Sequence, residues 1–293
     1  MPDVCSASSA AGKPAFVLVH GGWHGAWCYS KLIPYLLQAG HVAIARDLPG
    51  HGGLARYPRS FQQRPLDAAA FASELSPLAG LTLVDYVSDT MKSIDALIGA
   101  GSGPVVLLGH SMGGIAITAV GEAAPEKIRK LVYLTAFMPA SGVPAMAYRS
   151  SEAEGGKLGT TLKADPAKAG ALRLDPRSTD PAYIARLRQA LAEDISDEDW
   201  ATVQSLLSPD APAQPFTTAI ETTRGRWGKI PRAYVRCRED AAITYGTQNR
   251  FIELADEFTP DNKTEVREMD ASHSPFLSNP KKLADILLEL ASN

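Results

Sequence analysis

Residues 109–114 of this 293-residue chain place a serine where it could act as a nucleophile. They read Gly-His-Ser-Met-Gly-Gly, which matches the G-x-S-x-G pattern of a nucleophile elbow. The motif lies between a predicted strand, Val105–Leu108, and a predicted helix, which is the context that such an elbow requires. The sharp turn should strain the backbone of Ser111 by roughly 1–3 kcal/mol and lift its hydroxyl above the sheet edge. The motif's first two glycines, at positions 109 and 113, avoid clashes with the neighbouring strand and helix. Ser111 is the candidate nucleophile.

A serine hydroxyl is a weak nucleophile, so it needs a general base. The chain has six histidines, five of which lie in the first 110 residues. Behind such an elbow the partners follow in the order serine, acid, histidine, so His273 is the candidate base. It follows the last predicted strand, at the same carboxyl-end edge of the sheet as Ser111. The remaining histidines near the motifs are interpreted as structural: His20, His24, His51 and His110.

Two adjacent acidic residues, Glu239 and Asp240, follow the predicted strand Arg232–Arg238. Adjacent side chains at a strand end point in different directions, so at most one of them faces His273. The shorter side chain favours Asp240, and Glu239 stays open as the alternative. Asp270 is rejected because it ends the strand that leads into the histidine loop. The acid would hold the imidazole tautomer and stabilise the imidazolium.

A glycine-rich loop, His20–Gly25, follows the first predicted strand. A backbone N–H from such a loop pairs with the N–H after the nucleophile to form an oxyanion hole. The predicted donors are therefore Gly22 and Met112. No set of histidines and acidic residues has metal-ligand spacing, so neither a metal nor a cofactor is expected.

The elements that must position these residues alternate between short apolar runs and amphipathic stretches. The predicted strands are Ala15–His20, Val42–Asp47, Val105–His110, a run within Ile128–Phe137, Arg232–Arg238 and Thr264–Met269. The predicted helices between and after them are Trp27–Gln38, Leu83–Ile98, Met112–Ala124, Gln248–Phe258 and Pro280–Ala291. This alternation predicts an α/β protein with a mainly parallel six-stranded sheet and helices on both faces.

Residues 140–229 break the alternation and contain no convincing strand. They carry two helical patterns with a capping residue near the start of each, Pro181–Ala192 and Asp197–Leu206. We interpret this stretch as a helical cap inserted after the fourth strand, dividing the core into residues 1–139 and 230–293. A disordered linker is the alternative, and the apolar content of the stretch disfavours it.

Composition excludes several classes of protein. The net charge is −3, from 29 basic and 32 acidic residues, whereas a nucleic-acid binder usually shows a basic excess. No apolar run approaches the roughly 18–20 residues that cross a bilayer, and residues 1–10 lack a signal-peptide pattern. Three cysteines without a CxxC pair favour a reducing cytoplasm. The expected partner is a small-molecule ester, and a homodimer is left open.

Several motifs together resemble the α/β-hydrolase superfamily over essentially the whole chain. Within it, the chain is similar to the plant-type methyl esterases and hydroxynitrile lyases and their bacterial relatives. The segments that carry this resemblance are Val17–Trp27, Asp47–Gly52, Gly109–Gly114, Leu134–Pro139 and Asp197–Ala201. The resemblance implies an α/β-hydrolase fold, places the acid on Asp240 and places the oxyanion donor on Gly22.

Two departures from that group shape the expected function. The lyases of the group have a threonine at the position of Gly21 and a lysine at that of Ser274. Without that ammonium, ester hydrolysis is favoured. We therefore expect a serine carboxylesterase acting on a small to medium ester through an acyl-enzyme. The alternatives are a lyase, a lactonase, an amide hydrolase, or a ligand-binding protein without catalysis. Residues Gly53–Gly80 form a longer excursion than in compact relatives, which we expect to shape the pocket mouth.

Overall fold

The computed structural model of the chain describes residues 12–148 and 152–292. Cys5 and the N-terminal stretch 1–10, on which the sequence-based expectations about cysteines and a signal peptide partly rest, lie outside these residues. Within the described ranges, no helix combines the length and the apolar character needed to cross a membrane.

Six parallel strands form the central sheet. They are β1 (Phe16–Val19), β2 (Ala43–Ala45), β3 (Val105–Ser111), β4 (Ile128–Ala136), β7 (Arg232–Cys237) and β8 (Glu265–Met269). Their order is β2-β1-β3-β4-β7-β8, with every neighbouring pair parallel. The nearly continuous apolar runs of β3 and β4 are buried because helices cover both faces of the sheet. The predicted parallel α/β sheet is confirmed.

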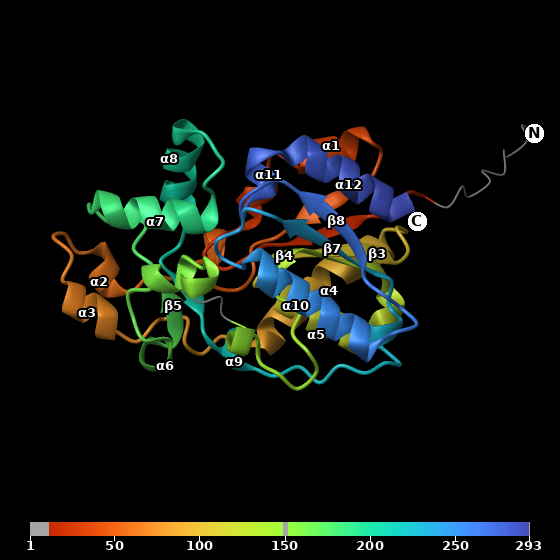
Figure 1. Cartoon of the computed structure of the whole chain (residues 1–293), viewed down its shortest axis with the longest axis horizontal. Helices are drawn as coiled ribbons and strands as arrows, with labels where there is room; N and C mark the ends of the chain where they lie inside the picture. Colours follow the sequence, from red (N-terminus) through yellow and green to blue (C-terminus); the bar gives the residue numbers. More distant parts are fainter. Residues whose placement is uncertain (1–11, 149–151, 293) are drawn as a thin grey trace, which may run out of the picture.

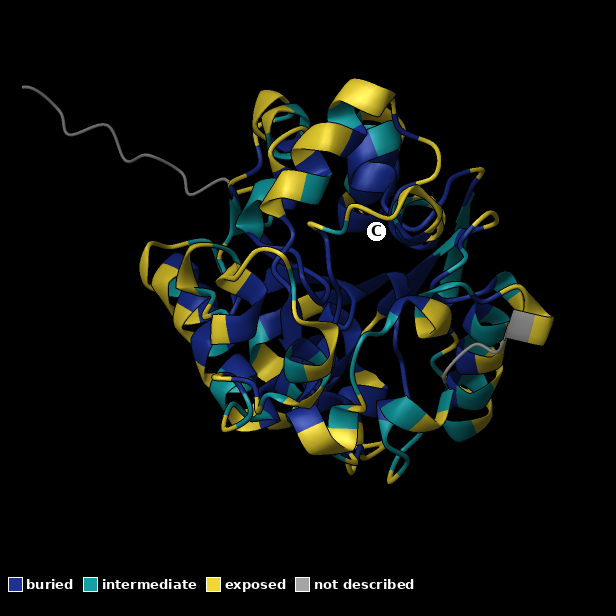
Figure 2. Cartoon of the chain, turned by 90° about the vertical axis from the view of Figure 1, so that its left-hand side faces the viewer, coloured by how far each residue is buried: buried dark blue, intermediate teal, exposed yellow. Residues whose placement is uncertain are grey.

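Helices cover the two faces of this sheet (Figure 1). One face carries α1 (Ile33–Gln38), α11 (Pro275–Ser278) and α12 (Pro280–Ser292), and the other carries α4 (Leu83–Gly99), α5 (Gly113–Ala123) and α10 (Tyr245–Phe258). Single 3-10 turns occur at Gly52–Leu54, Pro125–Lys127 and Trp227–Lys229. Coloured by burial, the sheet lies in the interior and the exposed residues lie on the outer helix faces (Figure 2).

The stretch Trp27–Gln38, predicted as one helix, is two elements. A 3-10 turn spans Ala26–Tyr29, and α1 begins only at Ile33. Pro34 lies in the first turn of α1, where a proline is tolerated because its missing N–H would have no partner there. The amphipathic pattern runs across both elements and therefore does not reveal the break.

Residues 140–229, called the insertion below, lie between β4 and β7. Its helices are α6 (Pro166–Ala169), α7 (Pro181–Leu191), α8 (Asp197–Leu206) and α9 (Gln214–Thr217), and its 3-10 turns are Ala145–Tyr148, Glu152–Glu154 and Leu158–Thr161. It also holds an antiparallel strand pair, β5 (Ala171–Arg173) and β6 (Asp210–Pro212). The expectation of no strand here is wrong, because strands of three residues are too short to produce a readable alternation.

The excursion Gly53–Gly80 forms α2 (Arg59–Gln62) and α3 (Ala68–Ser73) beside the insertion. The link is Arg173 of β5, which is fully buried. Its guanidinium forms two hydrogen bonds of 2.8 Å with Asp210 of β6 and donates to the carbonyls of Phe71 and Glu74. The buried pair therefore joins the excursion and the strand pair into one unit.

Candidate active site

Ser111 is the last residue of β3, and α5 begins two residues later at Gly113. Its φ is +52°, a left-handed conformation that side chains other than glycine rarely adopt, so the expected strain is confirmed. Three glycines let the chain make this turn. A Cβ at position 109 would lie 2.7 Å from the Gly113 carbonyl, and one at position 113 would lie 2.6 Å from the Val19 carbonyl oxygen. At position 114 it would lie 2.1 Å from the Phe137 carbonyl oxygen.

Asp240 and His273 form a buried pair at the same edge of the sheet. The Nδ1–H of His273 donates to Oδ2 of Asp240 over 2.7 Å, and both side chains are almost fully buried. The second carboxylate oxygen of Asp240 accepts the backbone N–H groups of Ala242 and Ile243, at 2.6 and 2.9 Å. These two backbone donors hold the carboxylate in the loop that follows β7, so its orientation toward the imidazole is set by the chain itself.

The other two acidic candidates lie away from the imidazole. Glu239 is exposed, and its backbone N–H bonds to the carbonyl of Ala271. Asp270 pairs with Arg238 at 3.4 Å, and 69% of its side chain is exposed. The structure therefore brings Asp240, and neither alternative, to His273.

The ring of His110 connects Ser111 to the histidine loop. Its centroid lies 4.6 Å from that of the His273 ring, with the two planes tilted by 51°, and its Nε2–H donates to the His273 carbonyl over 2.8 Å. Among the described residues, no hydrogen bond joins the Ser111 hydroxyl to the His273 imidazole. Catalytic hydrogen bonds are often long in unliganded proteins and shorten when substrate binds.

The glycine-rich loop after β1 lies against the elbow. A Cβ at Gly21 would lie 2.8 Å from the Ser111 Cβ, and one at Gly22 would lie 3.9 Å from the Met112 sulfur. Position 21 therefore leaves no room for a side chain without a shift, while Gly22 is the loop residue beside Met112.

Two buried histidines hold the carbonyls of this loop. His20 donates from Nδ1 to the Gly21 carbonyl, and its Nε2 accepts the N–H of Leu48. His24 donates from Nδ1 to the Gly22 carbonyl. Burial lowers the pKa of His20 to about 4 and that of His24 to about 3, and the protonated form of either would lose hydration that the protein does not replace.

Burial also lowers the pKa of His51 to about 3 and holds that of His110 well below its usual value. These four histidines are therefore neutral at pH 7 and cannot add a positive charge beside Ser111. No group of three or more histidine, cysteine or acidic side chains in the described ranges is placed to hold a metal ion.

Two polar contacts, one of Asp240 and one of the residue before His273, were not foreseen from the sequence. Thr135, which lies near the end of β4 with a φ of +35°, donates to the same Asp240 oxygen that receives His273. Asp194 of the insertion accepts the hydroxyl and the backbone N–H of Ser272, the residue before the histidine. A polar residue at the end of an apolar strand was the available signal for Thr135, whereas no local pattern marks Asp194.

A narrow apolar pocket of about 40 Å³ opens on Ser111. Core elements contribute Trp23, Phe137 and Ala242, and the insertion contributes Met146, Leu158, Gly159, Leu162, Leu172 and Phe216. None of the residues that line this pocket comes from Gly53–Gly80. That this excursion shapes the mouth of the pocket stays a prediction. The excursion packs on the far side of β5.

An elbow serine, a buried histidine–carboxylate pair and a parallel sheet together define an α/β hydrolase. Residues 16–286 match the model of the "Alpha/beta hydrolase family", and the chain belongs to that family. The family resemblance inferred from the motifs is thereby confirmed.

Among characterised proteins, the chain is similar to the plant methyl esterase group. It is 30% identical to salicylic acid-binding protein 2 of Nicotiana tabacum over 282 residues, covering 94% of this chain and 96% of that protein. It is 29% identical to methylesterase 7 of Arabidopsis thaliana over 279 residues, covering 94% of this chain and 95% of that protein.

Solved structures of similar proteins have the same fold. The crystal structure of polyneuridine aldehyde esterase superposes with a TM-score of 0.71 at 26% identity, covering 95% of this chain and 99% of that one. A pyrethroid hydrolase from Sphingobium faniae shares the fold, with a TM-score of 0.73 at 22% identity, covering 95% of this chain and 97% of that one.

Proposed function

We propose that this protein is a serine carboxylesterase that hydrolyses a small to medium, mostly apolar ester through an acyl-enzyme. The observation that carries the proposal is the Asp240–His273 pair at the same sheet edge as the strained Ser111, with an apolar pocket opening on that serine. The names of the similar plant proteins, several of them methylesterases, support ester chemistry.

In this mechanism the Ser111 hydroxyl attacks the ester carbonyl and His273 accepts its proton. Asp240 stabilises the resulting imidazolium. The backbone N–H groups of Gly22 and Met112 hold the oxyanion, and α5 adds the positive end of its dipole. The protonated His273 then gives its proton to the leaving alcohol, and water activated by the same imidazole releases the acid.

Residues 140–229 act as the cap in this proposal, because they supply most of the apolar wall above Ser111. A pocket of about 40 Å³ is far smaller than a typical drug-sized ligand site of roughly 300–1,000 Å³. A short acyl chain is therefore the substrate group that suits this pocket, and turnover of p-nitrophenyl esters should fall as the acyl chain lengthens.

Two positions argue against lyase chemistry. A threonine at position 21 would collide with the Ser111 Cβ, since even a bare Cβ there lies 2.8 Å away. Ser274 follows His273, and its hydroxyl donates to the Leu191 carbonyl over 2.6 Å, so no ammonium stands at that position to stabilise a cyanide leaving group. Release of cyanide from a panel of cyanohydrins would overturn this preference.

The central test compares Ser111→Ala with Ser205→Ala, a matched change at an exposed serine of α8. We expect Ser111→Ala to lose roughly 10³-fold or more in kcat on p-nitrophenyl acetate, and Ser205→Ala to keep parental activity. A fluorophosphonate should label the parent protein at Ser111 and leave Ser111→Ala unlabelled. Parental turnover in folded Ser111→Ala, or a parent that resists labelling, would refute the proposal and favour a ligand-binding role without catalysis.

A further inference from the structure

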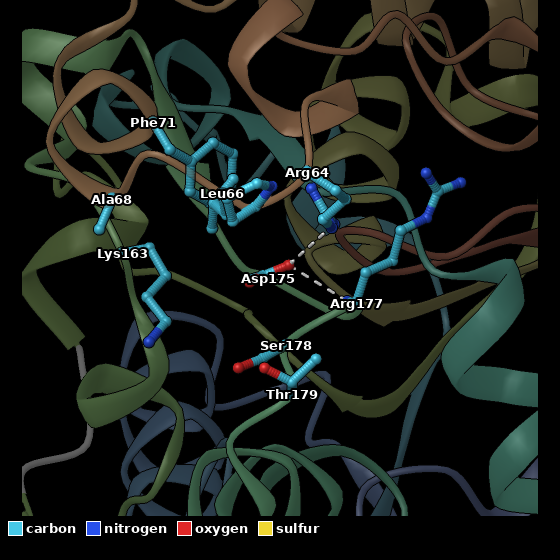
Figure 3. Close-up of a pocket in the computed structure, with 10 residues that line it drawn as sticks. Arg64, Leu66, Ala68, Phe71, Lys163, Asp175, Arg177, Ser178 and Thr179 are labelled. Atoms are coloured by element: carbon cyan, nitrogen blue, oxygen red, sulfur yellow. Dashed lines mark hydrogen bonds and ion pairs between the residues drawn. The ribbon is translucent and has the colours of Figure 1, made fainter.

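A second cavity, of about 580 Å³, lies between the excursion Gly53–Gly80 and the insertion. Figure 3 shows its residues: the excursion contributes Arg64, Pro65, Leu66, Ala68 and Phe71, and the insertion contributes Lys163, Asp175, Arg177, Ser178 and Thr179. None of these residues lines the pocket at Ser111. A volume in the range of small-molecule sites makes this cavity large enough for a ligand.

The charges around the cavity are unbalanced. The side chains of Arg64 and Lys163 carry positive charge at the cavity, whereas a single carboxylate, that of buried Asp175, lines it. One oxygen of this carboxylate accepts the backbone N–H of Arg177 over 3.2 Å and lies 3.9 Å from the Arg64 guanidinium. The cavity therefore keeps an excess of positive charge, which favours an anionic occupant.

The ammonium of Lys163 is the group that would bind an anion in this cavity directly. It is half-buried, and its ammonium lies 3.8 Å from the centre of the Tyr183 ring. It makes no ion pair or side-chain hydrogen bond with any residue that the structure describes. With no anionic partner among the described residues, this ammonium can pair with a bound anion.

Hydroxyl groups face Lys163 across the cavity, and apolar side chains form its end. Ser178 and Thr179 lie together at the lower end of the view, across from Lys163, whereas Leu66 and Phe71 lie together at its upper end (Figure 3). The Ser178 oxygen accepts the N–H of Asp180 at 3.3 Å, which leaves its own hydrogen for an incoming acceptor. This arrangement suits a molecule with a charged head and an apolar body.

The placement of the two arginines favours a carboxylate over a phosphate. Arg64 donates from Nη1 to the carbonyls of Phe61 and Gln63, both at 2.7 Å, and its guanidinium lies over the Phe61 ring. The Arg177 guanidinium lies 5.0 Å from the same ring centre and extends away from the cavity (Figure 3). Neither presents the bidentate fork that phosphate recognition favours, so a carboxylate held by one ammonium and hydroxyls fits better.

We propose that this cavity is a binding site for a small organic carboxylate with an apolar, preferably aromatic, body. The cavity and the pocket at Ser111 are lined by neighbouring residues of the chain: Leu162 lines the pocket, and the next residue, Lys163, lines this cavity. The site does not depend on the ester chemistry proposed above, and failure of either proposal leaves the other standing.

The test is calorimetric titration of the full chain with 2-naphthoate, with its neutral analogue 2-naphthamide and inorganic phosphate as comparison ligands. We expect one naphthoate per chain and at least tenfold weaker binding of the amide and of phosphate. Lys163→Gln should raise the Kd at least tenfold. Lys168→Gln removes the same charge from an exposed position of the insertion outside the cavity and should change the Kd less than twofold.

Ser111→Ala separates this cavity from the catalytic pocket, and its Kd for naphthoate should equal that of the parent. Thr179→Val should weaken binding while leaving the fold unchanged by circular dichroism. The proposal is overturned if naphthoate does not bind at millimolar concentration, or if Lys163→Gln binds like Lys168→Gln. It is equally overturned if phosphate or the amide binds as tightly as naphthoate.

Discussion

Acidification below pH 6.5 should destabilise this protein through four buried histidines beside the active site. His20, His24 and His51 have folded-state pKa values of about 4, 3 and 3, and the pKa of His110 also lies well below its usual value, in each case because burial disfavours the charged ring. In the unfolded chain each ring titrates near 6.5. The unfolded state therefore binds more protons as the pH falls, and the free energy of unfolding decreases from about pH 6.5 down toward the folded-state values.

The magnitude follows from linkage. A histidine that stays neutral in the folded state and titrates near 6.5 when unfolded costs about 1.4 kcal/mol between pH 7.5 and 5.5. The four rings together cost about 5 kcal/mol, which is comparable to the whole stability of many domains. Carboxylates held by ion pairs, such as Glu268 with a pKa of about 2, lose their contribution at lower pH and do not affect this window.

Urea denaturation at pH values between 5.5 and 7.5 measures this slope. In His51→Gln the slope between pH 5.5 and 6.5 should fall by about 1 kcal/mol per pH unit, because the unfolded ring takes up roughly 0.7 proton on average over this window. Tyr86→Phe removes the hydroxyl that lies 3.4 Å from Nδ1 of His51 but keeps the ring, so its slope should match the parent even if its stability differs. An unchanged slope in His51→Gln, or a parent that becomes more stable on acidification, would refute the reasoning.

Three further substitutions test the site and its supports. Thr135→Val removes one hydrogen-bond donor to Asp240 and should lower kcat on p-nitrophenyl acetate about tenfold or more with little change in KM. If kcat keeps the parental value, this hydrogen bond does not contribute to turnover. Gly21→Ala places a Cβ 2.8 Å from that of Ser111 and should reduce turnover at least tenfold, and unchanged turnover would contradict the close packing. Arg173→Met leaves buried Asp210 unpaired and should cost about 3–5 kcal/mol in urea unfolding. The double variant with Asp210→Leu should regain much of the lost free energy of unfolding. If it does not, the loss does not come from the unpaired Asp210 carboxylate.

Local sequence was sufficient for the elbow and the sheet. Ser111 could be identified because its glycines are required by contacts within one strand–turn–helix unit, and those contacts depend on residues close in the chain. The six strands were located within a few residues because buried parallel strands are short continuous apolar runs. His273 followed by elimination, since it is the one histidine after Ser111.

Tertiary structure decided what depends on residues distant in the chain. The sequence favoured Asp240 over Glu239, but the contact itself appears only in the turn after β7, where the Ala242 and Ile243 amides hold the carboxylate toward His273. Thr135 lies 105 residues from Asp240, so no local pattern could pair them.

The cavity beside Lys163 also depends on residues that are distant in the chain. Its walls come from two segments about a hundred residues apart, joined because the buried Arg173 guanidinium must satisfy its donors on the carbonyls of α3. The sequence by itself determined the fold class and selected Ser111 and His273 as the candidate nucleophile and base, because each of these predictions rests on a local pattern or on residue order. The orientation of the acid, the strand pair of the insertion and the cationic cavity required the folded chain, because side-chain direction and long-range hydrogen bonding create them.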